Sequence, residues 1–340
     1  MNKENIQSKF MGSLSNFCLK KTSLIIIGLI IGIFFGWSVR GILLNHELDQ
    51  SLNLRESGYE YISPLLDVEP RSMINRSDLI ILENGLQELI TEILHKNEGH
   101  ISHVSIYYKE FSSGAWIGIN EKENFSPASL LKVPLMMAYF KIADTNKNYL
   151  EKKIQYQPIE VEVSQNITPT NSLIKGELYS IEELINKMIV DSDNQAFFTL
   201  YKYMKQQDQK KTYLDLGLKF PDENEPEDFM NVKDYAGFFR ILYNASYLSK
   251  EMSSKALKLL TKVTFDKGII AGVSNNIKVA HKFGERGYAM NSIKQLHDCG
   301  IVYHPKKPFL LCVMTRGDKI ENLEDVIQEI SKYTYRAIDK

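Results

Sequence analysis

Ser129 and Lys132 stand three residues apart in an apolar segment where a basic side chain is unusual. Residues at this spacing share one face of a helix, so the serine hydroxyl and the lysine amine can meet. Burial lowers the pKa of a lysine amine toward the range in which it can accept a proton. A hydroxyl beside such an amine is an activated nucleophile, so the pair predicts covalent catalysis. Alone the pattern is weak: it recurs at residues 172–175, which we interpret as a loop.

Two later polar segments offer groups that complete such a site. Ser192, Asp193 and Asn194 separate two apolar helical segments, a position that is often only a helix corner. In a site, the serine could carry a proton, the asparagine could hydrogen-bond a substrate amide, and the aspartate could hold the loop. Lys282 stands at the end of an expected strand beside Gly284, which allows a ligand close to the backbone.

The nucleophile pair is expected at the start of a helix. Ser126 followed by Pro127 predicts an N-cap and a first helical position, which places Ser129 in the first turn. There the unpaired N–H groups and the helix dipole favour negative charge developing on the oxygen. Pro134 removes the helical hydrogen bond to the carbonyl of Leu130 and is expected to kink the helix.

The remaining pattern supplies the elements around that helix. Apolar spacing predicts a helix from Asp78, and a capping box at Ser180 and Glu183 opens another. The acidic residues 208–231 are interpreted as a solvated surface loop. Strands are expected at 103–108, 115–119, 277–284, 292–303 and 309–315, and a closing helix at 321–338.

Composition excludes several classes of function. The 340 residues are 44% hydrophobic and 24% charged, with a net charge of −1, which is ordinary for a globular protein. No basic stripe with interleaved aromatics indicates nucleic-acid binding. The histidines form no metal-binding pattern, so we expect neither metal nor cofactor and interpret His281 as structural.

An uncharged apolar segment at residues 22–39, extended to 44 beyond Arg40, is long enough to span a bilayer. Lysines precede it, so we expect the N-terminus in the cytoplasm and the rest outside. A cleaved signal peptide is disfavoured because no small-x-small site follows. The predicted organisation is a cytoplasmic tail (1–21), a single-pass anchor in the cell membrane (22–44), a stalk (45–77) and a main domain (78–340). Within the stalk, residues 59–66 are either a tether or a strand packed on the main domain.

Cys299 and Cys312 fall opposite each other if the last hairpin is centred near Lys306, at a separation that a disulfide can bridge. Outside the cytoplasm the bond can form. Two free buried cysteines are the alternative, and the sequence leads us to favour it.

The three polar motifs occur in one order: Ser-x-x-Lys at 129–132, Ser-Asp-Asn at 192–194 and Lys-Phe-Gly at 282–284. This set resembles the penicillin-recognising serine hydrolases, and its spacing is most similar to that of class A β-lactamases, over about residues 78–340. The resemblance implies an α/β (α+β) fold, in which helices flank a five-stranded antiparallel sheet and an all-helical subdomain carries Ser129 and Ser192.

The resemblance also implies roles for these residues. Ser129 would be the nucleophile that is acylated, Lys132 the base or its partner, and Ser192 a relay of the proton to the leaving nitrogen. Asn194 would bind the substrate's side-chain amide, and Lys282 would attract the substrate's carboxylate.

An oxyanion hole is implied as well. Backbone N–H groups of Ser129 and of Glu285, which follows Gly284, would form it.

Two departures from the family pattern concern turnover. Phe283 replaces a threonine or serine whose hydroxyl helps hold the substrate carboxylate. The loop that carries a glutamate to position the hydrolytic water looks shortened, and Glu225 is the nearest candidate. Without that water an acyl-enzyme would persist, as in a penicillin-binding protein.

Three interpretations follow. The first is a membrane-anchored β-lactamase-like enzyme that opens β-lactam amides through a Ser129 acyl-enzyme. The second is a D-Ala-D-Ala carboxypeptidase acting on peptidoglycan stem peptides, with slow deacylation. The third, a non-catalytic wall- or ligand-sensing domain, is disfavoured because a binding module does not need the lysine. The expected partners are such a small substrate and the lipid bilayer, and no nucleic acid.

Overall fold

The computed structural model describes residues 54–67, 76–160, 167, 172–217, 220, 226–287 and 292–339. The predicted anchor at residues 22–44 and the candidate base Glu225 lie outside these residues. Among the helices that are described, none has the length and apolar character needed to cross a membrane.

The main domain is built on a five-stranded sheet in which every neighbouring pair is antiparallel, in the order β4-β3-β11-β10-β9. This confirms the sheet implied by the resemblance. Almost every residue of the last two strands along the chain is buried, so both faces of the sheet are covered. The strands are β3 (Ile101–Glu110), β4 (Trp116–Ile119), β9 (Val279–Gly287), β10 (Lys294–Val302) and β11 (Phe309–Gly317).

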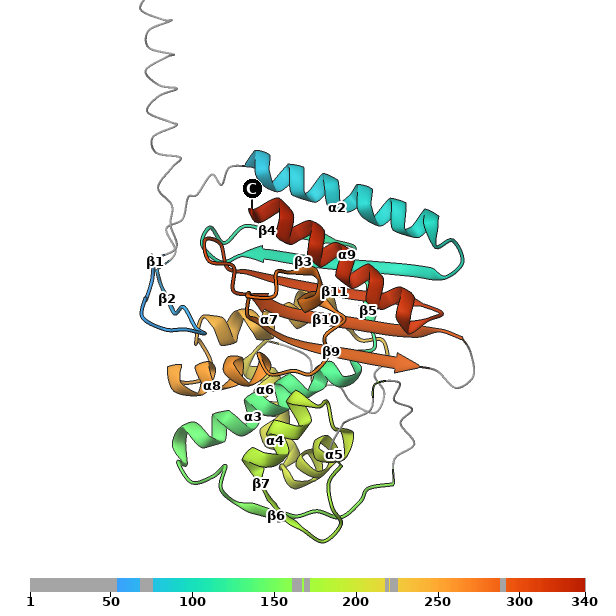
Figure 1. The fold of residues 1–340 in the computed structure, drawn as a ribbon. Coiled ribbons are helices and arrows are strands. Elements are labelled where there is room, and N and C mark those ends of the chain that lie inside the picture. The colour runs from blue at the N-terminus through green and yellow to red at the C-terminus, as the bar shows by residue number, and fades with distance from the viewer. Residues whose placement is uncertain are drawn as a thin grey trace, which may run out of the picture. The chain divides into compact units, whose positions relative to one another are not determined.

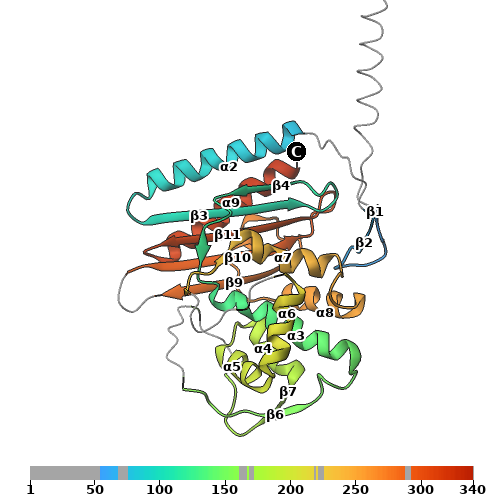
Figure 2. The ribbon, with the colours of Figure 1, turned by 180° about the vertical axis from the view of Figure 1, so that it is seen from behind.

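Helices from the two ends of the domain share one face of the sheet (Figure 1). They are α2 (Arg76–Lys96) and α9 (Ile320–Asp339), which pack against each other and on the strands. The opposite face is covered by α7 (Val232–Tyr243), which contacts β3, β10 and β11 (Figure 2).

A helical subdomain lies beyond α7 and meets the sheet at its β9 edge (Figure 1). The predicted capping box is present: Ser180 Oγ accepts from Glu183 N, and the Glu183 carboxylate accepts from Ser180 N. Residues 208–215, part of the segment that the sequence predicts to be a loop, are helical. The subdomain helices are α3 (Lys132–Thr145), α4 (Ile181–Val190), α5 (Asn194–Tyr203), α6 (Gln206–Asp215) and α8 (Lys250–Leu260).

Short elements complete the fold. Residues 59–66 pack on the main domain: Tyr61 and Ile62 are buried, and Ser63 N donates to Tyr243 O at 2.8 Å. The short strands form three pairs, β1 (Leu54–Arg55) with β2 (Leu65–Asp67), β5 (Asn124–Phe125) with β8 (Met230–Asn231), and β6 (Lys153–Gln155) with β7 (Leu178–Ser180). Two 3₁₀ turns are η1 (Ala128–Leu131) and η2 (Ile269–Gly272).

Cys299 and Cys312 form a disulfide between β10 and β11, so our preference for free thiols is wrong. The predicted register is correct, because the two residues are direct partners with their Cα atoms 4.0 Å apart. Such close opposition inside a fully buried sheet leaves the two sulfur atoms facing each other, which favours the bond over two separately packed thiols.

Candidate active site

The turn before the nucleophile differs from the sequence prediction. The N-cap is Pro127, no side chain caps the turn, and Ala128 has a φ of +47°. An α-helix cannot continue through a left-handed residue, so Ser129 lies in the 3₁₀ turn η1 and α3 begins only at Lys132. A strained non-glycine residue directly before the candidate nucleophile is a feature often found at functional sites.

Instead of capping a helix, Ser126 is held by its backbone from the sheet. Its N–H donates to Gln295 Oε1 at 3.0 Å, and its carbonyl lies 3.0 Å from His297 Nε2. Thr315 N donates to the other ring nitrogen of His297, so the imidazole is neutral with its proton on Nε2. Burial lowers the pKa of His297 to about 4, which keeps this arrangement in place at neutral pH.

Pro134 falls within the first turn of α3, where a backbone N–H would lack a helical partner in any case. The carbonyl of Leu130, which lies before α3, accepts from Tyr235 Oη at 3.1 Å. This buried hydroxyl of α7 satisfies the carbonyl and fixes the junction between η1 and α3.

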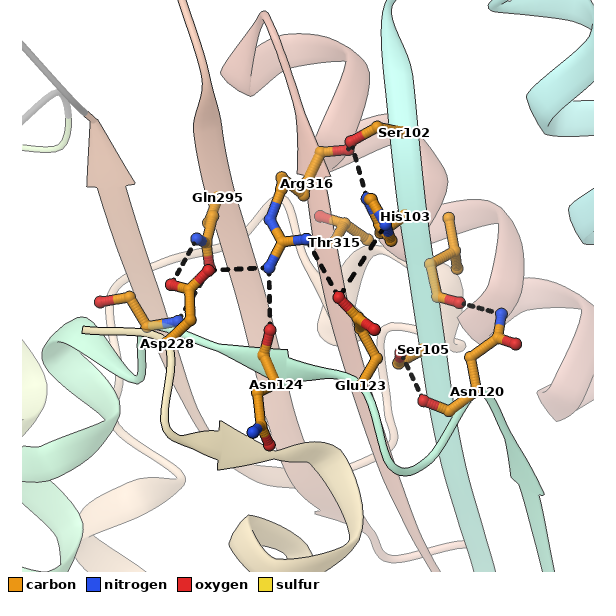
Figure 3. A network of polar contacts seen from close by, with 12 residues as sticks. Ser102, His103, Ser105, Asn120, Glu123, Asn124, Asp228, Gln295, Thr315 and Arg316 are labelled. Carbon is orange, nitrogen blue, oxygen red and sulfur yellow. Dashed lines mark hydrogen bonds and ion pairs between the residues drawn. The ribbon is translucent and has the colours of Figure 1, made fainter. Parts of the chain in front are cut away.

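The end of the acidic loop is anchored beside the segment that leads to the nucleophile (Figure 3). Asp228 accepts from Gln295 Nε2 and from the Arg316 guanidinium, both at 2.9 Å. Arg316 also donates to the backbone oxygen of Asn124 at 2.8 Å. Because Gln295 holds Asp228 and Ser126 together, this network couples the loop to the backbone that presents Ser129.

The structure brings together the three side chains predicted to perform catalysis. Lys132 Nζ lies 2.8 Å from Ser129 Oγ, 3.0 Å from Ser192 Oγ and 2.6 Å from the Ser192 carbonyl oxygen. It also lies 2.7 Å from Asn194 Oδ1. An ammonium has three protons for these four oxygens, whereas a neutral amine can accept a proton from one of the hydroxyls.

The environment of Lys132 favours the neutral amine. Burial lowers the pKa of Lys132 to about 7, and the negative charges of Asp193 and Glu285 oppose part of that shift. Asp193 is held in place because its side chain accepts from Ala196 N at 2.9 Å and caps α5, which is the loop-holding role that the sequence suggests. At neutral pH a large fraction of Lys132 can therefore act as a base.

A second buried lysine shares the same serine. Lys282 Nζ donates to Ser192 Oγ at 2.9 Å and to the Phe283 carbonyl at 3.0 Å. Burial, with a smaller contribution from the neighbouring Lys132, holds the pKa of Lys282 well below its usual value. Ser192, with a φ of +54°, is thus fixed between two amines, which is the geometry of a proton relay.

Gly284 and Glu285 bring strand β9 against the nucleophile turn. A Cβ on Gly284 would lie 2.9 Å from the backbone oxygen of Pro127, so only glycine permits this approach. The Glu285 side chain is buried and accepts from Ile167 N at 2.8 Å.

Sequence reasoning missed Gln295, His297 and Tyr235, which position the backbone around Ser129. Gln295 and His297 lie within β10 and Tyr235 lies within α7, and the polar groups that they bind are more than 100 positions away in the chain. A glutamine and a histidine inside a strand are a sequence signal for the first two, and Tyr235 had none.

The antiparallel sheet, the helical subdomain and the Ser-Lys-Ser cluster between them define a serine hydrolase of the penicillin-recognising class. The model of the β-lactamase enzyme family matches residues 84–338, and the chain belongs to this family. It is 25% identical to β-lactamase VEB-1 of Pseudomonas aeruginosa over 242 residues, 64% of this chain and 79% of that protein.

Solved structures have the same fold. PBP-A superposes with a TM-score of 0.63 at 19% identity, covering 77% of this chain and 97% of that chain. A β-lactamase from Chitinophaga pinensis gives a TM-score of 0.63 at 19% identity, covering 75% of this chain and 100% of that chain.

We expect Gly284→Ala to separate β9 from η1, because the new methyl group meets backbone atoms of Pro127 and Leu130 as well as the Leu130 side chain. The free energy of unfolding should fall by about 1–3 kcal/mol, measured by denaturant titration. Gly237→Ala is the matched control, since a Cβ in that helix meets nothing within 4 Å. It should raise stability by roughly 0.5–1 kcal/mol. Equal effects of the two substitutions would contradict the close approach.

Proposed function

We propose that this protein opens β-lactam amides through an acyl-enzyme on Ser129. The observation that carries the proposal is the position of one buried amine, that of Lys132, within 3.0 Å of both Ser129 Oγ and Ser192 Oγ. A structural lysine would be expected to pair with an acid. This one is surrounded by hydroxyl, carbonyl and amide oxygens and has a pKa suited to a base.

The reaction proceeds in balanced steps. The neutral Lys132 amine takes the proton of Ser129 Oγ as that oxygen bonds to the carbonyl carbon. The carbon–nitrogen bond then breaks, and the leaving nitrogen takes the proton of Ser192 Oγ. The Lys132 ammonium then gives its proton to Ser192 Oγ across 3.0 Å. The product is the acyl-enzyme, with a neutral Lys132 amine and an intact Ser192 hydroxyl as at the start.

Backbone and amide groups bind the substrate in this scheme. The N–H groups of Ser129 and Glu285 stabilise the oxyanion, where loss of one such donor typically costs about 3–4 kcal/mol of barrier. Asn194 is oriented by its Oδ1 contact with Lys132, and its Nδ2 donates to the carbonyl of the substrate's side-chain amide.

A second candidate is a peptidase of the penicillin-binding type, in which the acyl-enzyme is hydrolysed slowly. Among the described residues, the acids whose charges act on Lys132 are Asp193 and Glu285. Each is held by a backbone N–H, of Ala196 and of Ile167 respectively. In the first candidate we propose Glu225 as the base for the hydrolytic water.

Incubation with a fluorescent penicillin should label the protein, and Ser129→Ala should abolish the label because the attacking oxygen is gone. Ser172→Ala is the matched control: it removes the exposed serine of the other Ser-x-x-Lys sequence and should leave labelling unchanged. Undiminished labelling of Ser129→Ala would refute the assignment. Mass spectrometry over time then separates the candidates, since rapid loss of the adduct indicates a lactamase and a persistent adduct a peptidase.

The rate of Ser129 acylation should rise with pH and level off above about 7, the pKa of Lys132, because only the neutral amine accepts the serine proton. One pH unit below that pKa, roughly a tenth of the Lys132 amine is neutral, so the acylation rate should be about a tenth of its plateau value. Stopped-flow measurement of adduct formation gives the profile. A rate that stays constant from pH 5 to 8 would exclude Lys132 as the base.

We also propose that residues 22–44 anchor the enzyme in the cell membrane with the catalytic domain outside. The uncharged length and the preceding lysines support this orientation. A protease added outside intact cells should release the catalytic domain, detected by an antibody against its C-terminus. Full protection of the domain in intact cells, with cleavage only after lysis, would contradict the orientation.

A further inference from the structure

A cluster of cations lies where α7 packs on the sheet beside strands β3 and β4 (Figure 2). Lys109 on β3 and Trp116 on β4 are direct partners in the sheet, so their side chains share one face. Lys233 of α7 lies over this face, because its Nζ is 4.2 Å from the centroid of the Trp116 ring. Since β4 and β9 form opposite edges of the sheet, the cluster is separate from the site at Ser129 and Lys282.

Trp116 connects the strands to the helix. Its side chain is 45% exposed and stacks on Tyr107 of β3 with 5.7 Å between ring centroids. The contact between the Lys233 ammonium and the indole is a cation–π interaction, which holds the amine above the sheet. The ring therefore fixes one cation of the cluster in position.

Lys233 and Arg240 stand on the same exposed face of α7. They are seven positions apart, which is close to two helical turns and about 10 Å along the helix axis. Gly237 lies between them, and a Cβ built there would meet nothing within 4 Å. The surface between the two cations is therefore open to a ligand.

Positive charges crowd Lys109, and no acid offsets them. Burial, together with the positive charges of Arg240 and Arg55, lowers the pKa of Lys109 to about 8. The amine donates to the backbone oxygen of Gly114, an uncharged group. Within the part of the chain that the structure describes, Lys109, Lys233 and Arg240 form no ion pair. Because the whole chain has a net charge of −1, this is a local concentration of positive charge and not general basicity.

The acids near this cluster in the sequence are directed elsewhere. Glu110 and Asp234 each accept a hydrogen bond from a side chain close to them in the chain. Glu121 lies against Gly118 of β4. The charges that act on Lys109 are nevertheless both positive, so these carboxylates do not neutralise the cluster.

We propose that Lys109, Trp116, Lys233 and Arg240 form a second binding site, the basic surface, which takes a chain of linked phosphate groups. A phosphate brings up to two negative charges and three acceptor oxygens. The planar guanidinium of Arg240 can bind two oxygens of one phosphate, and Lys233 can bind another phosphate as a point charge. Because these cations are about 10 Å apart along α7, several linked phosphates match them better than one ion does. The proposal does not depend on the acyl-transfer function.

The test is a calorimetric titration of the full chain, in neutral detergent micelles, with sodium tripolyphosphate. We expect saturable binding of one ligand per chain, at least about tenfold tighter than the binding of inorganic phosphate, because more cations are engaged. Arg240→Gln and Lys233→Gln should each weaken the binding about tenfold, equivalent to about 1.4 kcal/mol. Both side chains are exposed, so each variant should unfold at the same temperature as the unmodified protein.

A control variant and a fluorescence titration locate the ligand. Lys211→Gln removes the same single positive charge from the exposed surface of α6 and should leave the affinity unchanged. The chain has two tryptophans, so Trp37→Phe leaves Trp116 as the only one. Because Lys233 lies against the Trp116 ring, a phosphate that binds this amine should change the indole fluorescence with the midpoint of the calorimetric titration.

The absence of saturable binding would overturn the proposal, and so would equal affinities for tripolyphosphate and inorganic phosphate. It would also be overturned if either Arg240→Gln or Lys233→Gln weakened the binding no more than Lys211→Gln does. Constant fluorescence of Trp116, during a titration that calorimetry shows to saturate, would place the ligand elsewhere and overturn it as well.

Discussion

The site depends on keeping two lysine amines out of water around a single hydroxyl. Lys132 and Lys282 are almost fully buried, and both contact Ser192 Oγ. An isolated ammonium in such a place would be very unfavourable, so burial pushes both pKa values down. Carbonyl and hydroxyl oxygens accept hydrogen bonds from the two amines, and none of these acceptors carries a full negative charge. Had a carboxylate been placed in direct contact with Lys132, the amine would stay charged and could not accept a proton.

Positioning these groups requires backbone that ordinary secondary structure does not provide. Ala128 and Ser192 both have positive φ, and each directly adjoins or supplies a hydroxyl of the site. Hydrogen bonds from the sheet stabilise the strained backbone at Ala128. Gln295 accepts from the Ser126 N–H, and His297 donates to the Ser126 carbonyl. Rigid strands thereby impose on the nucleophile turn a geometry that its own sequence would not adopt.

Local sequence patterns predicted the strands, most helices and the residues of the Ser-Lys-Ser cluster. Strand alternation, capping boxes and short motifs each depend on residues that are close together in the sequence. The same patterns failed where residues far apart in the sequence form hydrogen bonds that override the local preference. Ser126 has a good capping side chain, yet its backbone is bound by β10, and α3 starts at Lys132 and not at Pro127. For the disulfide, the predicted register is correct and the preference for free thiols is wrong, because the direct pairing of Cys299 with Cys312 already implies a separation that the bond can span.

The lowered pKa of Lys132 links activity to stability with a definite sign. Its pKa falls from an ordinary value of 10.5 to about 7 in the folded protein. Between these values the unfolded chain binds a proton that the folded chain does not, so this group makes the fold less stable as pH falls toward 7. Below pH 7 the penalty is at its full size and constant. Near neutral pH the protein therefore bears most of that penalty, and the proposed chemistry needs an amine that has already lost its proton.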